Sequence, residues 1–237
     1  MDRFPLTHQS VLERMRSGDD TVRLGAFSDV VTGYWRPSYH YLRLHWRLSP
    51  DAAEDIVQGF FAVAFEKGYL ETFDPAKARF RTFLRTCLDR YLQNQRKAES
   101  ALKRGGGVEN LSLDFPGAEQ ELSLVSTDLR DLDQFFRDET IRSLFARAVA
   151  DLRDVLSREG KARAFEAFER HDLSDDEARS YAGVASAMGV PVTTVTNDLH
   201  AARRRFREIA LVHLRSLSGT DEEFRHEARQ LFGVDIT

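Results

Sequence analysis

The sequence predicts an all-α protein with two helical domains joined by a flexible acidic linker. Glycine and proline are scarce, with 14 and 6 among 237 residues. Apolar residues recur every three or four positions, which is the period of an amphipathic helix. A glycine run at 105–107 opens a long polar stretch near the middle of the chain. A connection of that length is typical of a linker or a functional loop.

The composition excludes several classes of protein. Hydrophobic residues make up 42% and charged residues 30%, which is enough for a packed core. The single cysteine, Cys87, excludes an intrachain disulfide and a cysteine-rich metal site. The longest apolar run, 60–65, is far shorter than a membrane span, and the first residues do not lead into an apolar signal core. We therefore expect a cytoplasmic protein with no membrane partner, metal or cofactor.

The first domain is expected over residues 1–100. A short helix should cover 10–16, and a second, rich in aromatic residues, should cover 22–46. Pro37 lies inside the second helix and should kink or divide it.

The third helix has the clearest start in the chain. Ser49 is a good N-cap and Pro50 suits the first helical position, and the acids that follow suit the positive end of the helix dipole. Gly68 and the turn at 73–75 end this helix, and a fourth follows over 76–98. The apolar stripe expected on the fourth helix is Phe80, Phe83, Leu84, Cys87, Leu88 and Tyr91.

The remaining chain is expected as a linker over 101–139, a second helical domain over 140–217 and an acidic C-terminal tail helix over 218–237. The net charge of −4 argues against nucleic-acid binding, but the charges are strongly segregated. Residues 79–104 carry eight basic and two acidic residues, and residues 199–215 carry five and one. Residues 109–139 carry nine acids and two bases. Two basic segments in two domains favour a polyanionic partner.

Residues 181–207 have the spacing of a helix-turn-helix. Ala185 is small where two helices must approach, and Gly189 supplies the turn. The expected buried seam of the second helix is Val192, Val195, Leu199, Ala202, Phe206 and Ile209. The opposite face, suited to base edges and phosphates in a major groove, is Thr193, Thr194, Thr196, Asn197, His200, Arg203 and Arg204. The same spacing also occurs in plain helical bundles.

These motifs together resemble a bacterial RNA polymerase sigma factor of the extracytoplasmic-function type. The stretch 49–61 resembles the polymerase-binding helix of that family. Residues 73–94, with Phe73-Asp74-Pro75 and the basic aromatic helix after it, resemble its promoter-melting loop and minus-ten helix. Residues 181–207 resemble its minus-thirty-five-reading helix-turn-helix. The resemblance covers roughly residues 20–100 and 140–215.

The resemblance implies a transcription initiation factor that binds core RNA polymerase and promoter DNA, both as duplex and as melted strand. It assigns polymerase binding to Asp51, Glu54, Asp55 and Gln58. It assigns minus-ten DNA binding to Phe73, Lys77, Arg79, Arg81, Arg85, Arg90, Asn94, Arg96 and Lys97. Phe73 is the aromatic expected to be exposed for base stacking. The acidic linker is expected to enter the nucleic-acid channel of the polymerase, and an anti-sigma factor is a further partner consistent with the family.

Three positions depart from the family pattern. Gly59 follows Gln58 where an acid is common, and Arg90 stands where asparagine is frequent. Asp198 lies in the recognition helix where a basic residue is usual, and its charge should repel phosphate and weaken the minus-thirty-five contacts.

Three other classes of protein could account for part of these features. An enzyme is disfavoured because the seven histidines are scattered, with no His-Glu-x-x-His pattern and no phosphate-binding glycine loop before a lysine. A helix-turn-helix regulator that is not a sigma factor explains residues 181–207 equally well, but not the acidic helix followed by the basic aromatic one. A scaffold that binds only protein would leave both basic segments merely solvated.

Overall fold

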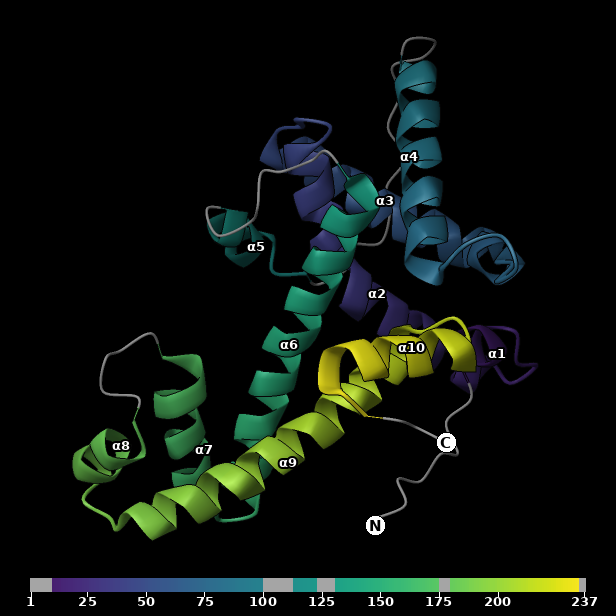
Figure 1. The fold of residues 1–237 in the computed structure, drawn as a ribbon. Coiled ribbons are helices and arrows are strands. Elements are labelled where there is room, and N and C mark those ends of the chain that lie inside the picture. The colour runs from purple at the N-terminus through teal and green to yellow at the C-terminus, as the bar shows by residue number, and fades with distance from the viewer. Residues whose placement is uncertain (1–9, 100–112, 123–130, 175–179, 235–237) are drawn as a thin grey trace. The chain divides into compact units, whose positions relative to one another are not determined.

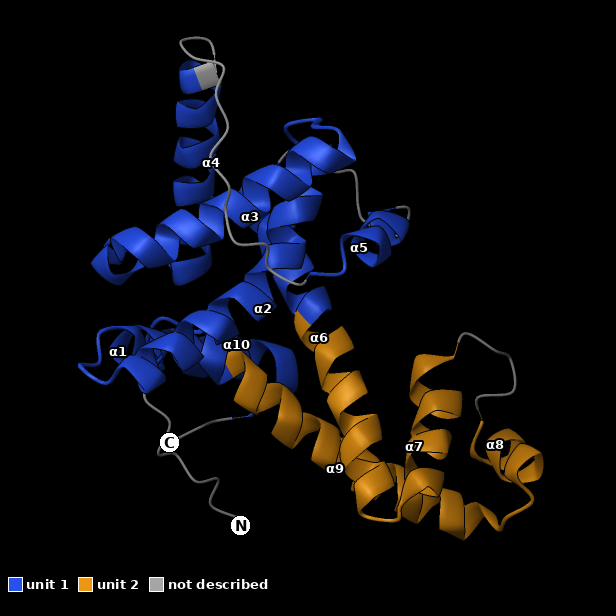
Figure 2. Ribbon diagram, turned by 180° about the vertical axis from the view of Figure 1, so that it is seen from behind, with its two compact units in different colours: residues 1–143, 215–237 blue, residues 144–214 orange. Residues whose placement is uncertain are grey.

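The computed structural model describes residues 10–99, 113–122, 131–174 and 180–234, and every regular element in them is helical (Figure 1). The predicted all-α class is therefore confirmed for these residues. The chain divides into two compact units (Figure 2). Unit 1 comprises residues 1–143 and 215–237, and unit 2 comprises residues 144–214. The C-terminal tail, expected to follow the second domain, thus belongs to the unit built by the N-terminal half.

Unit 1 begins with two capped helices. Ser10 and Glu13 form a capping box at α1 (Val11–Met15), and Asp19 caps α2 (Asp20–Leu44). Of the two outcomes expected at Pro37, a kink or a division, the division is wrong, because α2 continues through the proline. An interior proline costs roughly 3 kcal/mol, and the burial of Trp35, Tyr39 and Tyr41 around it offsets that cost.

The next two helices have the predicted boundaries to within a few residues. Helix α3 (Pro50–Lys67) starts at the Ser49 cap and ends at Gly68, whose φ of 60° suits glycine. A 3₁₀ turn, η1 (Tyr69–Thr72), leads to α4 (Phe80–Glu99). The fully buried residues of α4 are Phe80, Leu84, Leu88 and Leu92, whereas Phe83, Cys87 and Tyr91 are half-buried.

The expected linker 101–139 contains ordered helix in its described part. Helix α5 (Phe115–Glu121) lies on α2, with the Phe115 ring 5.3 Å from those of both Trp35 and Tyr39. Glu119 accepts a 2.8 Å hydrogen bond from Arg43 Nε, and Glu121 pairs with Arg36. The sequence assigned these acids to a flexible linker because their basic partners lie about 80 residues earlier in the chain.

Helix α6 (Leu132–Arg158) starts inside the expected linker. Its Glu139, counted there as a linker acid, is 3% exposed and lies 2.7 Å from Nδ1 of the buried His40. The carbonyl of Ala118 can only accept, so His40 Nε2 donates to it over 3.0 Å, and Nδ1 forms the hydrogen bond with Glu139. This pair joins α2, α5 and α6 inside unit 1.

The chain end returns to unit 1 through the last turn of α9 (Val192–Leu217). The Tyr34 hydroxyl donates to the Leu217 carbonyl over 2.9 Å, and the Val11 amide donates to the Ser218 carbonyl over 3.3 Å. Helix α10 (Asp221–Phe232) follows, capped by Thr220 and ended by Gly233 at φ 63°.

Unit 2 is built around one apolar core. Besides parts of α6 and α9 it contains α7 (Ala162–Phe168), the π turn η3 (Glu169–Leu173) and α8 (Tyr181–Met188). The core residues are Leu152, Leu156, Ala164, Phe165, Ala167, Phe168, Val184, Ala185, Val195, Leu199 and Ala202. Residues of α8 and α9 thus share one buried core.

The His40–Glu139 pair gives a test of the fold. Glu139→Leu should destabilise the protein by about 3–5 kcal/mol, because it leaves a buried polar partner unpaired. The neighbouring Asp138→Leu removes an acid that is 57% exposed and should cost less than about 1 kcal/mol. Urea unfolding measures both. A double variant, His40→Leu with Glu139→Leu, should recover most of the loss, and equal costs for the two single variants would contradict the assignment.

Candidate nucleic-acid interface

Helices α8 and α9 form the helix-turn-helix geometry in unit 2. Ser180 caps α8, and Gly189 adopts a φ of 63° at its end. The Val190 amide then donates to the Ala185 carbonyl over 3.1 Å, which closes the turn before α9 starts. The glycine is required here because a left-handed φ strains other residues.

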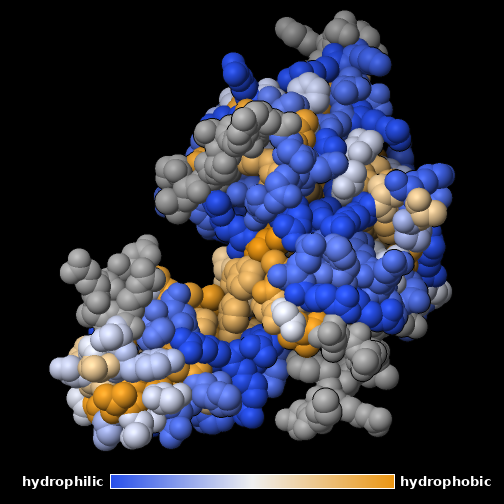
Figure 3. All heavy atoms as spheres, in the orientation of Figure 1, coloured by the Kyte–Doolittle hydropathy of each residue, from blue (hydrophilic) through white to orange (hydrophobic). Residues whose placement is uncertain are grey.

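The predicted seam of α9 is buried in its centre. Val195, Leu199 and Ala202 are at most 1% exposed, and Phe206 and Ile209 are partly buried against the same core. Val192 is 45% exposed, so its expected burial is wrong, since the first residue of α9 lies beyond the core residues of α7 and α8. Figure 3 shows apolar side chains at the surface near α8 and the start of α9.

The opposite face of α9 is largely open to solvent. Its exposed members are Thr193, Thr196, Asn197, His200 and Arg204, while Thr194 and Arg203 are half-buried. Short polar side chains along one face of a helix, with cations further along, match what a major groove requires of a reading helix.

Arg203 is held inside unit 2. Its Nε and Nη2 donate to the Asp172 carboxylate over 2.8 and 2.7 Å, and its Nη1 donates to the Tyr181 hydroxyl over 3.2 Å. Burial raises the pKa of Asp172, but the hydrogen bonds from Arg203 and His171 outweigh it and lower the pKa overall. Arg203 therefore braces η3 against α8 and α9, whereas Arg204 is exposed.

Asp198 has a partner that sequence reasoning missed. Arg163, at the start of α7, donates from Nε to the Asp198 carboxylate over 2.7 Å. The Asp198 side chain is 16% exposed and that of Arg163 is 57% exposed. The acid expected to repel phosphate is thus covered by a cation.

In unit 1 the basic helix α4 has two different halves. Towards its C-terminal end Arg90, Asn94, Arg96 and Lys97 are exposed, and the Arg96 guanidinium lies 4.9 Å from the centre of the Trp46 ring. The N-terminal arginines are paired: Arg79 and Arg81 with Glu227 of α10, and Arg85 with both Asp89 and Asp133.

Phe73 is not the exposed aromatic that was predicted. Its side chain is 2% exposed, and its ring lies 5.3 Å from that of Phe80 and 5.4 Å from that of Phe83. Arg16 donates to the Phe73 carbonyl over 2.9 Å, so the turn after η1 directs the ring into the core. Lys77 from the same loop is exposed and lies 3.2 Å from Asp74.

The four residues assigned to polymerase binding separate into two pairs. Asp51 and Asp55 are exposed one turn apart on α3. Gln58 is only 8% exposed and donates to Glu54 over 3.1 Å. The exposed acids are therefore Asp51 and Asp55, with Glu54 oriented by Gln58.

The structure also accounts for Gly59. A Cβ at this buried position would collide with the hydroxyl of Tyr91 on α4. The missing side chain thus lets α3 and α4 pack closely, and an acid could not be accommodated there without displacing Tyr91.

The acids of the expected linker are largely neutralised where the structure describes them. Asp114 and Glu121 face Arg36, Glu119 faces Arg43, and Asp133 faces Arg85. Asp131 caps the start of α6. Glu109 and Asp128 lie outside the described residues.

Among the described residues no group of three or more His, Cys, Asp or Glu side chains is arranged to hold a metal ion. No helix in the described ranges combines the length and apolar character needed to cross a membrane.

Comparison with family models, with curated proteins and with solved structures finds no match for the chain.

The Arg163–Asp198 pair is testable with duplex DNA. Arg163→Ala should weaken binding of unit 2 to a random-sequence duplex about fivefold at low salt, because an uncovered charge near phosphate costs ~1 kcal/mol. Fluorescence anisotropy of a labelled duplex measures it. Adding Asp198→Asn should restore the affinity, and a double variant as weak as Arg163→Ala would show that the Asp198 charge is not the cause.

Proposed function

We propose that this protein is a sigma-type transcription initiation factor that binds core RNA polymerase and directs it to promoters. The observation that carries the proposal is that unit 1 has both exposed acids on α3 and an exposed, positively charged end on α4. An acidic end for protein docking and a basic end for nucleic-acid binding on one compact unit suit a factor that bridges an enzyme and DNA.

The minus-ten contact is assigned to the exposed end of α4. Arg90, Arg96 and Lys97 would neutralise backbone phosphates, and Asn94 would meet a base edge. Extruding a base costs a few kcal/mol, and stacking on an aromatic returns about 1–3 kcal/mol. Since Phe73 is buried, Trp46, whose ring lies beneath Arg96, takes its place as the stacking candidate.

The minus-thirty-five contact is assigned to the first turns of α9. Thr193, Thr196, Asn197 and His200 would face base edges, and Arg204 a phosphate. Thr194 and Arg203 would support this face from within unit 2. The activity consists of binding and positioning, so it requires no covalent step by the chain.

The alternative, a helix-turn-helix regulator, has support from unit 2 alone. It leaves Asp51 and Asp55 on α3 without a role. A sigma-type function explains the exposed residues of both units, and for that reason we favour it.

Run-off transcription distinguishes these functions. With purified core polymerase and fragmented genomic DNA, the full chain should generate discrete transcripts whose sequenced starts share upstream elements. Core polymerase without the protein is the control. A regulator would yield no such starts, and their absence would contradict the proposal.

The α3 acids allow a second test. Asp55→Lys should weaken capture of core polymerase by about tenfold or more, because it reverses a charge in a complementary interface, while the circular dichroism stays unchanged. Glu66→Lys is the matched control: it reverses an exposed acid on the same helix, about 16 Å further along the axis. Equal capture by the two variants would refute the assignment of Asp55.

A further inference from the structure

Helix α10 places a buried carboxylate among three arginines of unit 1. The Glu227 side chain is 3% exposed. Its Oε1 lies 2.7 Å from Arg79 Nη1 and 2.9 Å from Arg81 Nη1, and its Oε2 lies 3.1 Å from Arg137 Nη2. Arg79 and Arg81 are two of the residues assigned above to minus-ten DNA, and Arg137 from α6 joins them only in the folded unit.

The Glu227 side chain is ionised in this cluster. Burial raises the pKa of Glu227, but the guanidinium groups of Arg81 and Arg137 outweigh it and lower the pKa overall. Glu227 is therefore a carboxylate shared by three guanidinium groups, although Arg137 also lies 4.0 Å from Asp138 and Arg81 also interacts with Glu223. An oxyanion held by several guanidinium groups is also how proteins hold phosphate.

A second acid of α10 occupies the start of the basic helix. Glu223, one turn before Glu227, accepts from the Phe80 amide over 3.3 Å and from the Gly219 amide over 3.0 Å. Phe80 is the first residue of α4, where the helix dipole favours an anion. Helix α10 thus offers carboxylates at two positions that suit a polyanion.

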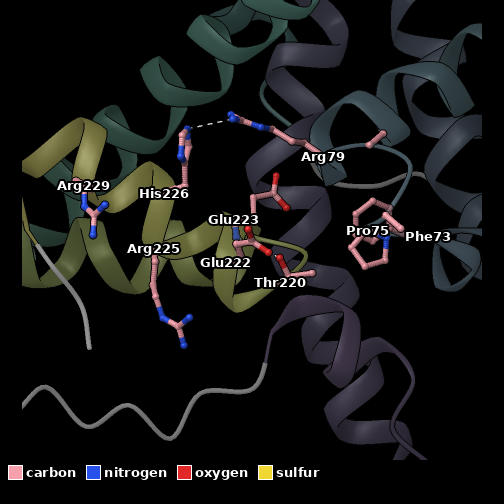
Figure 4. Close-up of a pocket in the computed structure, with 11 residues that line it drawn as sticks. Phe73, Pro75, Arg79, Thr220, Glu222, Glu223, Arg225, His226 and Arg229 are labelled. Carbon is pink, nitrogen blue, oxygen red and sulfur yellow. Dashed lines mark hydrogen bonds between the residues drawn. The ribbon is translucent and has the colours of Figure 1, made fainter.

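Part of the contact between α10 and the 73–79 loop is open. A cavity of about 650 Å³ lies between them, lined on one side by Phe73, Pro75 and Arg79 and on the other by Glu223 and His226 (Figure 4). His226 reaches Arg79 across it, with 3.0 Å between Nε2 and Nη2. Polar contacts therefore hold this side of α10, and such contacts can be exchanged for those of another anion.

We propose that Arg79, Arg81 and Arg137 form a binding site for backbone phosphate of single-stranded DNA, and that Glu227 occupies it until DNA displaces α10. The inference rests on the proposed function and extends it. It adds Arg137 to the DNA-binding residues and makes the tail a competitor of DNA for the N-terminal half of α4. DNA binding and α10 docking are then mutually exclusive at this site.

The test compares two full-length variants that each remove one negative charge from α10. Glu227→Gln keeps the side-chain shape but releases the arginines, and Glu222→Gln changes an exposed acid of the same helix. Anisotropy with a labelled single-stranded oligonucleotide should show about tenfold tighter binding for Glu227→Gln and at most about twofold for Glu222→Gln. The slope of log K against log salt should steepen by about 0.7 for each phosphate gained. Equal affinities of the two variants would overturn the proposal.

A measurement on the unaltered protein tests the proposal even if the variant misfolds. Hydrogen–deuterium exchange in residues 221–232 should rise when the oligonucleotide is added, because α10 leaves its site. Unchanged protection at saturating DNA would overturn the proposal. Arg137→Ala in the Glu227→Gln background should reverse most of the gain, whereas an unchanged affinity would exclude Arg137 from the site.

The two proposals fail in different ways. Run-off transcripts together with equal affinities of Glu227→Gln and Glu222→Gln would reject the competition by α10 and leave the initiation function standing. No transcripts and no binding of the oligonucleotide by any form would reject both.

Discussion

The neutralisation of clustered arginines is the interaction on which the arrangement of unit 1 depends. Arginines crowd α2 and the start of α4, where like charges at close range destabilise a compact state. Acidic residues from three later segments form ion pairs with these arginines. Helix α5 supplies Glu119 and Glu121, α6 supplies Asp133, and α10 supplies Glu227. The positions of α5, α10 and the start of α6 therefore follow from charge as well as from apolar burial.

The contribution of each ion pair to the stability of the fold depends on how deeply the pair is buried. An exposed pair such as Lys77–Asp74 contributes little, whereas Glu227 and Glu139 are almost completely buried. A buried charge is costly unless several partners surround it. Glu227 meets that condition with three guanidinium groups, and Glu139 meets it with His40 and Arg142. Removing one partner therefore affects more than the pair itself.

Local sequence signals predicted the helices well and the long-range contacts poorly. The cap at Ser49, the turn at Gly189 and the seam at Val195 and Leu199 are determined within a few residues of themselves, and the structure has them as predicted. Phe73 was misjudged because a hydrophobic residue in a polar loop carries no local sign of its direction. Arg16, 57 residues earlier, holds the backbone that turns its ring inwards.

The contacts of the candidate interface could not be predicted from the sequence for the same reason. Nothing near Asp198 indicates Arg163, and nothing near Arg79 indicates Glu227, because each pair forms only when distant helices pack. Summing charge by segment located the basic regions, but the sum treats every acid between them as solvated. In the folded chain Glu119, Asp133 and Glu227 of the tail lie against bases of unit 1. The exposed charge of the described residues is therefore concentrated on the C-terminal half of α4 and on the exposed face of α9.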